Sequence, residues 1–330
     1  MIQRNKTLDI YKGILIALVV LRHVLQYSVT DEGGILTNFI WAVQMPGFML
    51  VSGYFSARKI LSISEIRKRI ASSLQHYALP FLSWFILINV LLLGNYDRNP
   101  ILGLYTLFNH VDIGLWFLWV VFVLSIFASV LNICISSKSL KIVRFLGSIL
   151  LFYGLMIVLG KLYGLNFIGI KYILYYSLFY GFGWLVKWTE QWWKKWWSKA
   201  SNVIVALCFI SFLAIVFNYD LYHAGDGLIS IVMRLISGFT GNLVIINICC
   251  TYEKKLNKLK TSCIGMYTLE IYTTSVYVSA LMKASNNNVF FSLPGFGNFI
   301  VSLFLTVLFT VMIICVFYSN NIIKRVFYGK

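Results

Sequence analysis

Long apolar segments recur along almost the whole chain, and they constrain the fold more than any other feature. Ten segments approach or exceed the roughly 20 mostly apolar residues that a membrane-crossing helix needs. They are 8–29, 35–56, 74–94, 113–135, 143–160, 167–187, 202–218, 228–250, 264–282 and 297–318. Only 12% of the 330 residues are charged, against about a quarter in soluble domains. We therefore predict an all-α integral membrane protein, a bundle of about ten transmembrane helices, with residues 1–330 forming one polytopic membrane domain.

The basic residues predict how these helices are oriented. The net charge is +17, and most of the 28 Lys and Arg residues fall at the termini and in alternate loops. Because cytoplasmic loops are rich in Lys and Arg, this alternation predicts that both termini are cytoplasmic. Such clusters suit membrane lipids or an anionic cofactor, and they argue against a nucleic-acid partner. The six cysteines lack the spacing of a zinc site, so we expect no metal.

The first apolar segment contains four ionisable residues: Asp9, Lys12, Arg22 and His23. In a helix, Lys12 and His23 would lie about 16 Å apart along the axis and within about 20° on one face. Asp9 would share that face and could pair with Lys12, whereas Arg22 would point about 100° away. Ionisable groups inside a membrane are costly and indicate function, and histidine is the usual proton-transfer group. The alternatives are a helix-packing histidine and a lysine that extends to the interface.

These residues resemble the start of the membrane acyltransferase-3 family, particularly its fucose-4-O-acetylase-like and polysaccharide O-acetyltransferase members. Asp9, Lys12, Gly13 and His23 match the opening motif, with Lys12 where Arg is common. Thr274 stands where many relatives have His. Four further segments match in order: MPGFMLVSGYFSARK (45–59), RKRIASSLQHYALPFLSW (67–84), GLWFLWVVF (114–122) and GMYTLEIYTT (265–274).

The resemblance implies an enzyme of the bacterial cytoplasmic (inner) membrane. Family members transfer an acyl group, usually acetyl, from cytoplasmic acetyl-CoA to a sugar hydroxyl. The acceptor would be a surface polysaccharide or its lipid-linked precursor. Acetyl-CoA would be the donor co-substrate, and no metal would take part.

The candidate site residues fall into three groups. Catalytic candidates are His23, as general base or acyl-carrying nucleophile, with Arg22 and Glu270, which could also pair with each other. Candidates for binding acetyl-CoA are the charged residues near the inner surface: Lys12, Asp9, Arg58, Lys59, Arg67 and Arg69. Candidates for binding the acceptor are Ser52, Trp116 and Tyr272, although Ser52 and its neighbour Gly53 also suit close helix packing and an aromatic such as Trp116 also suits packing.

Two other functions fit the same sequence. A transporter of a polysaccharide or lipid-linked sugar would also have many spans and intramembrane polar residues, although the chain has no two-half repeat. A non-catalytic partner in a polysaccharide synthesis complex would explain the departures at Lys12 and Thr274. The sequence does not indicate an oligomeric state.

Overall fold

The computed structural model describes residues 5–28, 34–59, 62–136, 141–223, 225, 227–284 and 295–330. Within these residues the secondary structure is helical throughout, without a strand. The chain divides into two compact units, and each is interleaved in sequence. The first is Met1–Phe48 with Gln191–Val316, and the second is Met49–Glu190 with Phe317–Lys330.

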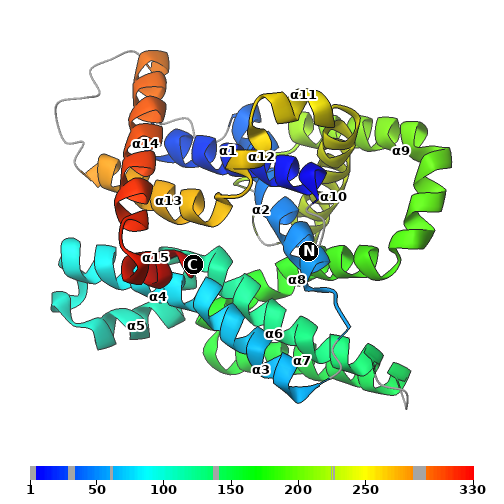
Figure 1. Ribbon diagram of the computed structural model, residues 1–330, viewed down its shortest axis with the longest axis horizontal. Helices are drawn as coiled ribbons and strands as arrows, with labels where there is room; N and C mark the ends of the chain where they lie inside the picture. Colours follow the sequence, from blue (N-terminus) through cyan, green and yellow to red (C-terminus); the bar gives the residue numbers. More distant parts are fainter. Residues whose placement is uncertain are drawn as a thin grey trace. The chain divides into compact units, whose positions relative to one another are not determined.

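The first unit is organised around the N-terminal helix (Figure 1). Its helices are α1 (Lys6–Ser28), the first part of α2 (Ile35–Ser56), α9 (Glu190–Asn218), α10 (Leu228–Thr251), α11 (Glu253–Lys258), α12 (Thr261–Ile264), α13 (Thr268–Ala284) and α14 (Gly295–Tyr318). Helix α1 packs against α10, α11, α12 and α13. Its residues Tyr11, Leu15 and Ile16 are fully buried, so α1 forms the core of this unit.

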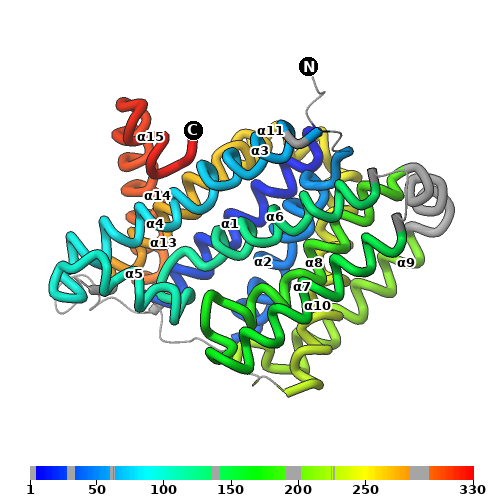
Figure 2. Tube along the Cα trace, turned by 90° about the horizontal axis from the view of Figure 1, so that it is seen from below, coloured from blue at the N-terminus to red at the C-terminus, as the bar shows by residue number. Residues whose placement is uncertain are grey.

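The second unit contains the rest of α2 and the central part of the chain (Figure 2). Its elements are α3 (Ile63–Ser73), η1 (Leu74–Ala78), α4 (Leu79–Phe85), η2 (Ile86–Leu92), η3 (Asn95–Arg98), α5 (Pro100–Asn109), η4 (Val111–Ile113), α6 (Trp116–Ser136), α7 (Lys141–Tyr163), η5 (Phe167–Gly169), α8 (Ile170–Trp188) and α15 (Asn321–Tyr328). Helix α6 packs against α3, α4, α7 and α8. The short C-terminal helix α15 packs on α4, where the indole Nε1 of Trp84 donates to the carbonyl of Phe327 at 3.0 Å.

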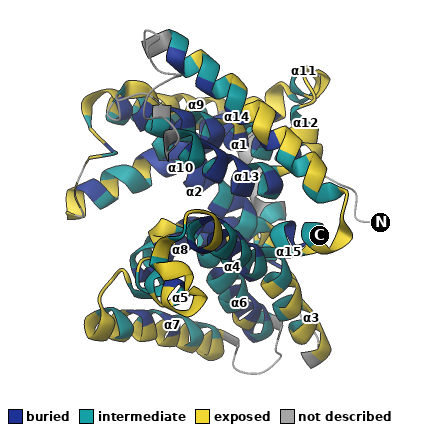
Figure 3. Cartoon of the chain, turned by 90° about the vertical axis from the view of Figure 1, so that its left-hand side faces the viewer, coloured by how far each residue is buried: buried dark blue, intermediate teal, exposed yellow. Residues whose placement is uncertain are grey.

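Each of the ten predicted segments overlaps a helix of the structure. Among the described residues, six helices are long and apolar enough to cross a membrane: Ile35–Ser56, Ser64–Leu92, Trp116–Ile135, Ile142–Tyr163, Leu228–Thr251 and Gly297–Tyr318. Large apolar side chains on these helices are exposed, for example Leu150 at 74% and Phe304 at 65% (Figure 3). Because exposed apolar surface on this scale is rare in soluble monomers, a membrane helical protein is supported. The count of ten spans and the cytoplasmic position of both termini stay predictions.

Glycines allow close backbone contact at two helix interfaces. A Cβ built on Gly13 would lie 2.2 Å from the carbonyl oxygen of Thr261, and one on Gly265 would lie 1.8 Å from that of Asp9. In the second unit a Cβ on Gly53 would lie 1.9 Å from the carbonyl of Tyr180. No other residue fits at such distances, so these backbones touch directly. For Gly53 this agrees with the packing role expected from the sequence.

Candidate functional site

The face of α1 that carries the predicted stripe begins with an ion pair. The Nζ of Lys12 lies 2.8 Å from Oδ1 of Asp9, so the pairing predicted from their spacing is confirmed. Asp9 is buried, whereas the Lys12 side chain keeps 20% of its surface exposed. A partly exposed ammonium held by a buried carboxylate is well placed to meet an anion that approaches this end of the helix.

The close contact between α1 and α12 sets the register of the next helix. Gly13 touches Thr261 and Gly265, and α13 then runs beside α1 in the same direction (Figure 1). At the far end, Tyr277 of α13 lies within electrostatic range of Tyr27 of α1. The two helices are therefore parallel neighbours over about four turns.

This register gives the order of the polar residues along α1 and α13. At 1.5 Å per residue, His23 lies about 15 Å beyond Gly13 along α1, and Thr274 lies about 6 Å beyond Glu270 along α13. Glu270 and Thr274 are both fully buried. Because α13 runs beside α1 in the same direction, Glu270 precedes Thr274 along the direction that leads from Lys12 to His23.

His23 has an incomplete set of hydrogen bonds. Its side chain is partly exposed, but its Nδ1 atom is buried and has no hydrogen-bond partner among the described residues. The imidazole stacks on Tyr27, with ring centroids 6.2 Å apart and an interplanar angle of 14°. A buried ring nitrogen without a partner is rare in folded proteins, and it is a chemical reason to assign this residue a role with a ligand.

Arg22 points into a different environment from its neighbour, as the helical geometry predicts. It is buried, and its guanidinium carbon lies 4.7 Å from the centre of the Tyr222 ring. The Tyr222 ring meets the Trp41 ring edge-on, with ring centroids 6.4 Å apart. The guanidinium carbon of Arg234 lies 5.1 Å from the centre of the Trp41 ring. Tyr222 is 200 residues from Arg22 in sequence, and no local pattern marks it as a partner.

The turn that carries Tyr222 is fixed by Asp220. The Oδ1 atom of Asp220 accepts hydrogen bonds from the backbone N–H groups of Tyr222 and His223, each at 3.0 Å. The hydrogen bond from the backbone of His223 is the main reason that the pKa of the Asp220 carboxyl is held below its usual range. This carboxylate therefore stays ionised near neutral pH and holds the turn beneath the Tyr222 ring.

The basic residues of the second unit that are predicted to bind acetyl-CoA are of two kinds: two cap a helix and two are exposed. Nε of Arg58 donates to the carbonyl of Phe55 at 3.2 Å, and Nη2 of Arg69 donates to that of Ser56 at 2.8 Å, so both cap the end of α2. Arg69 also has a buried Nη1 without a hydrogen-bond partner in the described chain. Lys59 and Arg67 are exposed.

The predicted acceptor-binding residues are not gathered in one unit. Ser52 belongs to the second unit and is partly exposed next to the Gly53 contact. Trp116, also in the second unit, stacks on Tyr172 and Tyr176 at 4.8 and 5.1 Å, which are contacts typical of packing. Tyr272 is buried in α13 of the first unit, beside α1.

The described residues contain no group of three or more His, Cys, Asp or Glu side chains that could hold a metal ion. The candidate site in the first unit consists of the stripe on α1 and the buried polar residues of α13. Their chemistry is that of an imidazole, hydroxyls, a carboxylate and a cation.

Comparison with known proteins shows what this chain is similar to. The model of a family described as an acyltransferase domain, of the acyltransferase-3 type, matches residues 5–318. Two curated relatives are both named nodulation protein NolL. One, from Sinorhizobium fredii, is 35% identical over 125 residues, which is 36% of this chain and 34% of the relative. The other, from Mesorhizobium japonicum, is 33% identical over 139 residues, which is 39% of this chain and 36% of the relative.

The matched region thus spans about a third of the length of each curated relative. No solved structure matches the chain.

Proposed function

The chain belongs to the membrane acyltransferase-3 family, and on this premise we propose that it transfers an acetyl group from cytoplasmic acetyl-CoA to a sugar hydroxyl. The acceptor would be a surface polysaccharide or its lipid-linked precursor, modified at the bacterial cytoplasmic membrane. The observation that carries the proposal is His23, about 15 Å beyond the Gly13 contact, whose buried Nδ1 has no hydrogen-bond partner in the described part of the chain.

The donor would enter at the end of α1 where Lys12 is paired with Asp9. Phosphate groups need cationic partners, and Lys12 offers one that is one-fifth exposed and already oriented by Asp9. The long pantetheine arm could then extend along α1 and bring the thioester toward His23. Lys59 and Arg67, which are exposed, together with Arg58 and Arg69 remain predicted phosphate contacts.

Two chemical routes are open to His23. As a general base it would take the proton from the acceptor hydroxyl while that oxygen attacks the thioester carbonyl, and the CoA thiolate would leave. As a nucleophile it would form an acyl-imidazole and release CoA, and the sugar oxygen would displace the imidazole in a second step. Arg22 is a candidate to stabilise the developing oxyanion, and Glu270 or Thr274 to orient the reacting groups.

The test is acetyl transfer by the purified protein. The protein would be given acetyl-CoA carrying a radiolabelled acetyl group, with a lipid-linked or soluble glycan, and label in the glycan would be counted. We expect His23→Ala to lose about 10²-fold or more of the rate, the usual contribution of a positioned acid–base group. His76→Ala is the matched control, because its Nδ1 already bonds to the carbonyl of Ser72 in the second unit.

Unchanged transfer by His23→Ala would overturn the catalytic role of His23. Glycan flux into vesicles without transfer would favour the transporter alternative. Label retained on the protein after rapid acid quench, and absent from His23→Ala, would identify the covalent route.

A further inference from the structure

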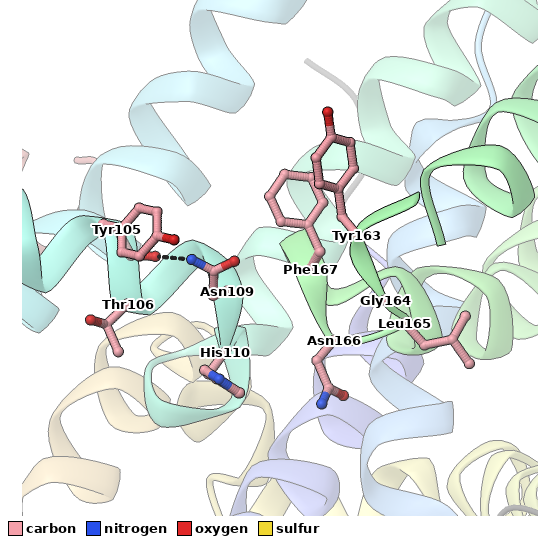
Figure 4. Close-up of a pocket in the computed structure, with 9 residues that line it drawn as sticks. All are labelled: Tyr105, Thr106, Asn109, His110, Tyr163, Gly164, Leu165, Asn166 and Phe167. Atoms are coloured by element: carbon pink, nitrogen blue, oxygen red, sulfur yellow. Dashed lines mark hydrogen bonds between the residues drawn. The ribbon is translucent and has the colours of Figure 1, made fainter. Parts of the chain in front are cut away.

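We propose that a pocket between α5 and the α7–α8 connection binds a pyranose ring of the acceptor glycan. The pocket lies within the second unit and has a volume of about 480 Å³. Figure 4 shows Tyr105, Asn109 and His110 of the α5 side facing Tyr163, Asn166 and Phe167 of the connection. This volume is within the usual range for small-ligand sites, about 300–1,000 Å³.

Aromatic rings line opposite sides of the pocket. Tyr105 is 70% exposed and Tyr163 is 64% exposed, so large parts of their rings are uncovered. On the connection side, Tyr163 and Phe167 form a tilted pair with centroids 4.9 Å apart. A pyranose has an apolar face of C–H groups, and that face stacks on aromatic rings that are open in this way.

Apart from Gly164 and Leu165, the remaining lining residues are polar. Asn109 uses one N–H to reach the carbonyl of Tyr105 at 2.9 Å, which leaves its other N–H and its carbonyl oxygen for a ligand. Asn166 and the His110 imidazole add further donors and acceptors. Thr106, whose hydroxyl donates to the carbonyl of Leu102 at 3.0 Å, adds an acceptor. None of the lining residues is Asp, Glu, Lys or Arg. Since phosphates and anionic headgroups select charged partners, this lining favours a neutral, hydroxyl-rich ligand.

The connection is held in a strained shape that keeps the lining in place. Ile168 has φ of +46°, in the left-handed region that β-branched residues avoid, between Gly164 at +90° and Gly169 at +71°. The indole Nε1 of Trp119 donates to the carbonyl of Ile168 at 2.9 Å and stabilises this conformation. Strain of this kind persists where surrounding contacts enforce it, and it is common at binding sites. Because the connection is already fixed in one conformation, less conformational entropy is lost when a ligand binds.

The identity of the ligand as acceptor rests on the proposed function, whereas sugar binding can be measured by itself. The probes are the methyl pyranosides of glucose, galactose, N-acetylglucosamine and fucose. Each would be added at about 10 mM, enough to occupy a millimolar site, to the full chain in nanodiscs free of glycoside detergent. Saturation-transfer NMR would then detect binding. We expect transfer to the ring C–H protons of at least one sugar.

Three variants test the assignment. Tyr163→Ala with Phe167→Ala removes one aromatic side and should reduce the saturation transfer at least fivefold. Tyr163→Phe keeps the ring and should retain most of the saturation transfer. This variant shows whether a change at position 163 by itself disturbs the fold. Leu162→Ala, in the last turn of α7 next to Tyr163 and 69% exposed but outside the lining, is the matched control and should equal the wild type.

Absence of saturation transfer for all four sugars, or equal transfer in the double variant and the wild type, would overturn the proposal. If the sugars bind but no acetyl group is transferred, the pocket assignment stands and the proposed function is refuted. If acetyl is transferred and the KM for the sugar is unchanged in the double variant, the pocket assignment is refuted and the proposed function stands.

Discussion

At the scale of single residues, adjacent side chains of α1 have separate tasks. Arg22 is held by the Tyr222 ring, whereas His23 stacks on Tyr27 and keeps a buried nitrogen that no described residue pairs with. Helix geometry alone predicted that the two would point about 100° apart. It also predicted the Asp9–Lys12 pair. It could not supply Tyr222, because the contact depends on a turn far away in the chain.

Lys12 is expected to contribute to donor affinity through its charge. Lys12→Gln should raise the KM for acetyl-CoA by about tenfold, the effect of losing one charge-assisted hydrogen bond of roughly 1.5 kcal/mol. Lys12→Arg, which restores a cation, should return most of the affinity. Steady-state kinetics at saturating acceptor would measure both. Equal KM values in all three proteins would show that the ammonium does not contact the donor.

Tyr222 is expected to stabilise the protein through the buried guanidinium. Tyr222→Leu should lower the free energy of unfolding by about 1–2 kcal/mol, because the desolvated cation loses the ring face. Tyr222→Phe keeps the ring and should cost much less. Thermal unfolding of the two variants in the same nanodisc measures the difference, and equal melting temperatures would contradict the cation–π contact.

At the scale of elements, direct backbone contact sets helix register. Gly13 was notable in the sequence only because it follows Lys12 in a family motif. The structure gives the physical reason, since Thr261 and Gly265 leave no space for a side chain there. Such contacts cannot be read from hydropathy, because glycine carries no pattern that names its partner. The apolar segments themselves were sufficient to locate the main helices. Two starts were misplaced, because α9 begins at Glu190 and not at 202, and the helix predicted from 74 is continuous with α3, which begins at Ile63.

Substitutions at this contact should be damaging even when small. Gly13→Ala should destabilise the protein by about 1–3 kcal/mol through overpacking, and it should lower activity by moving α1 against α13. Gly154→Ala in α7 is the control, since a Cβ there has nothing within 4 Å. Alanine at that position should be neutral or stabilising by up to about 1 kcal/mol. Equal melting temperatures for the two variants would contradict the contact.

At the scale of the whole molecule, the charge pattern predicts sidedness. Asp112 lies in a predicted outer loop and Lys258 in a predicted inner loop, and both are exposed. In a background without native cysteines, Asp112→Cys should react with a membrane-impermeant maleimide on intact cells. Lys258→Cys should react only after permeabilisation. The reverse pattern would invert the topology, and equal labelling of both would mean that the count of spans is wrong.

Hydropathy and charge predicted the class of the protein and the course of its helices. They did not predict the division into two interleaved units, because this depends on which distant helices pack together. The candidate pocket was also beyond sequence reasoning. Its two sides are separated by more than 50 residues, and its aromatic and amide side chains resemble those of ordinary interfacial loops.

For the proposed transfer from acetyl-CoA, the Gly13 contact also sets a limit on donor selectivity. Because α1 is fixed where its backbone touches Thr261 and Gly265, the ten residues from there to His23 act as a molecular ruler of about 15 Å. Side-chain substitutions do not change that length. Inserting one residue would move the imidazole by about 1.5 Å and turn it by about 100°, away from the reacting face. A longer acyl chain must therefore find its space beyond the imidazole, so variation among donors should be tolerated at the acyl end and not along the coenzyme arm.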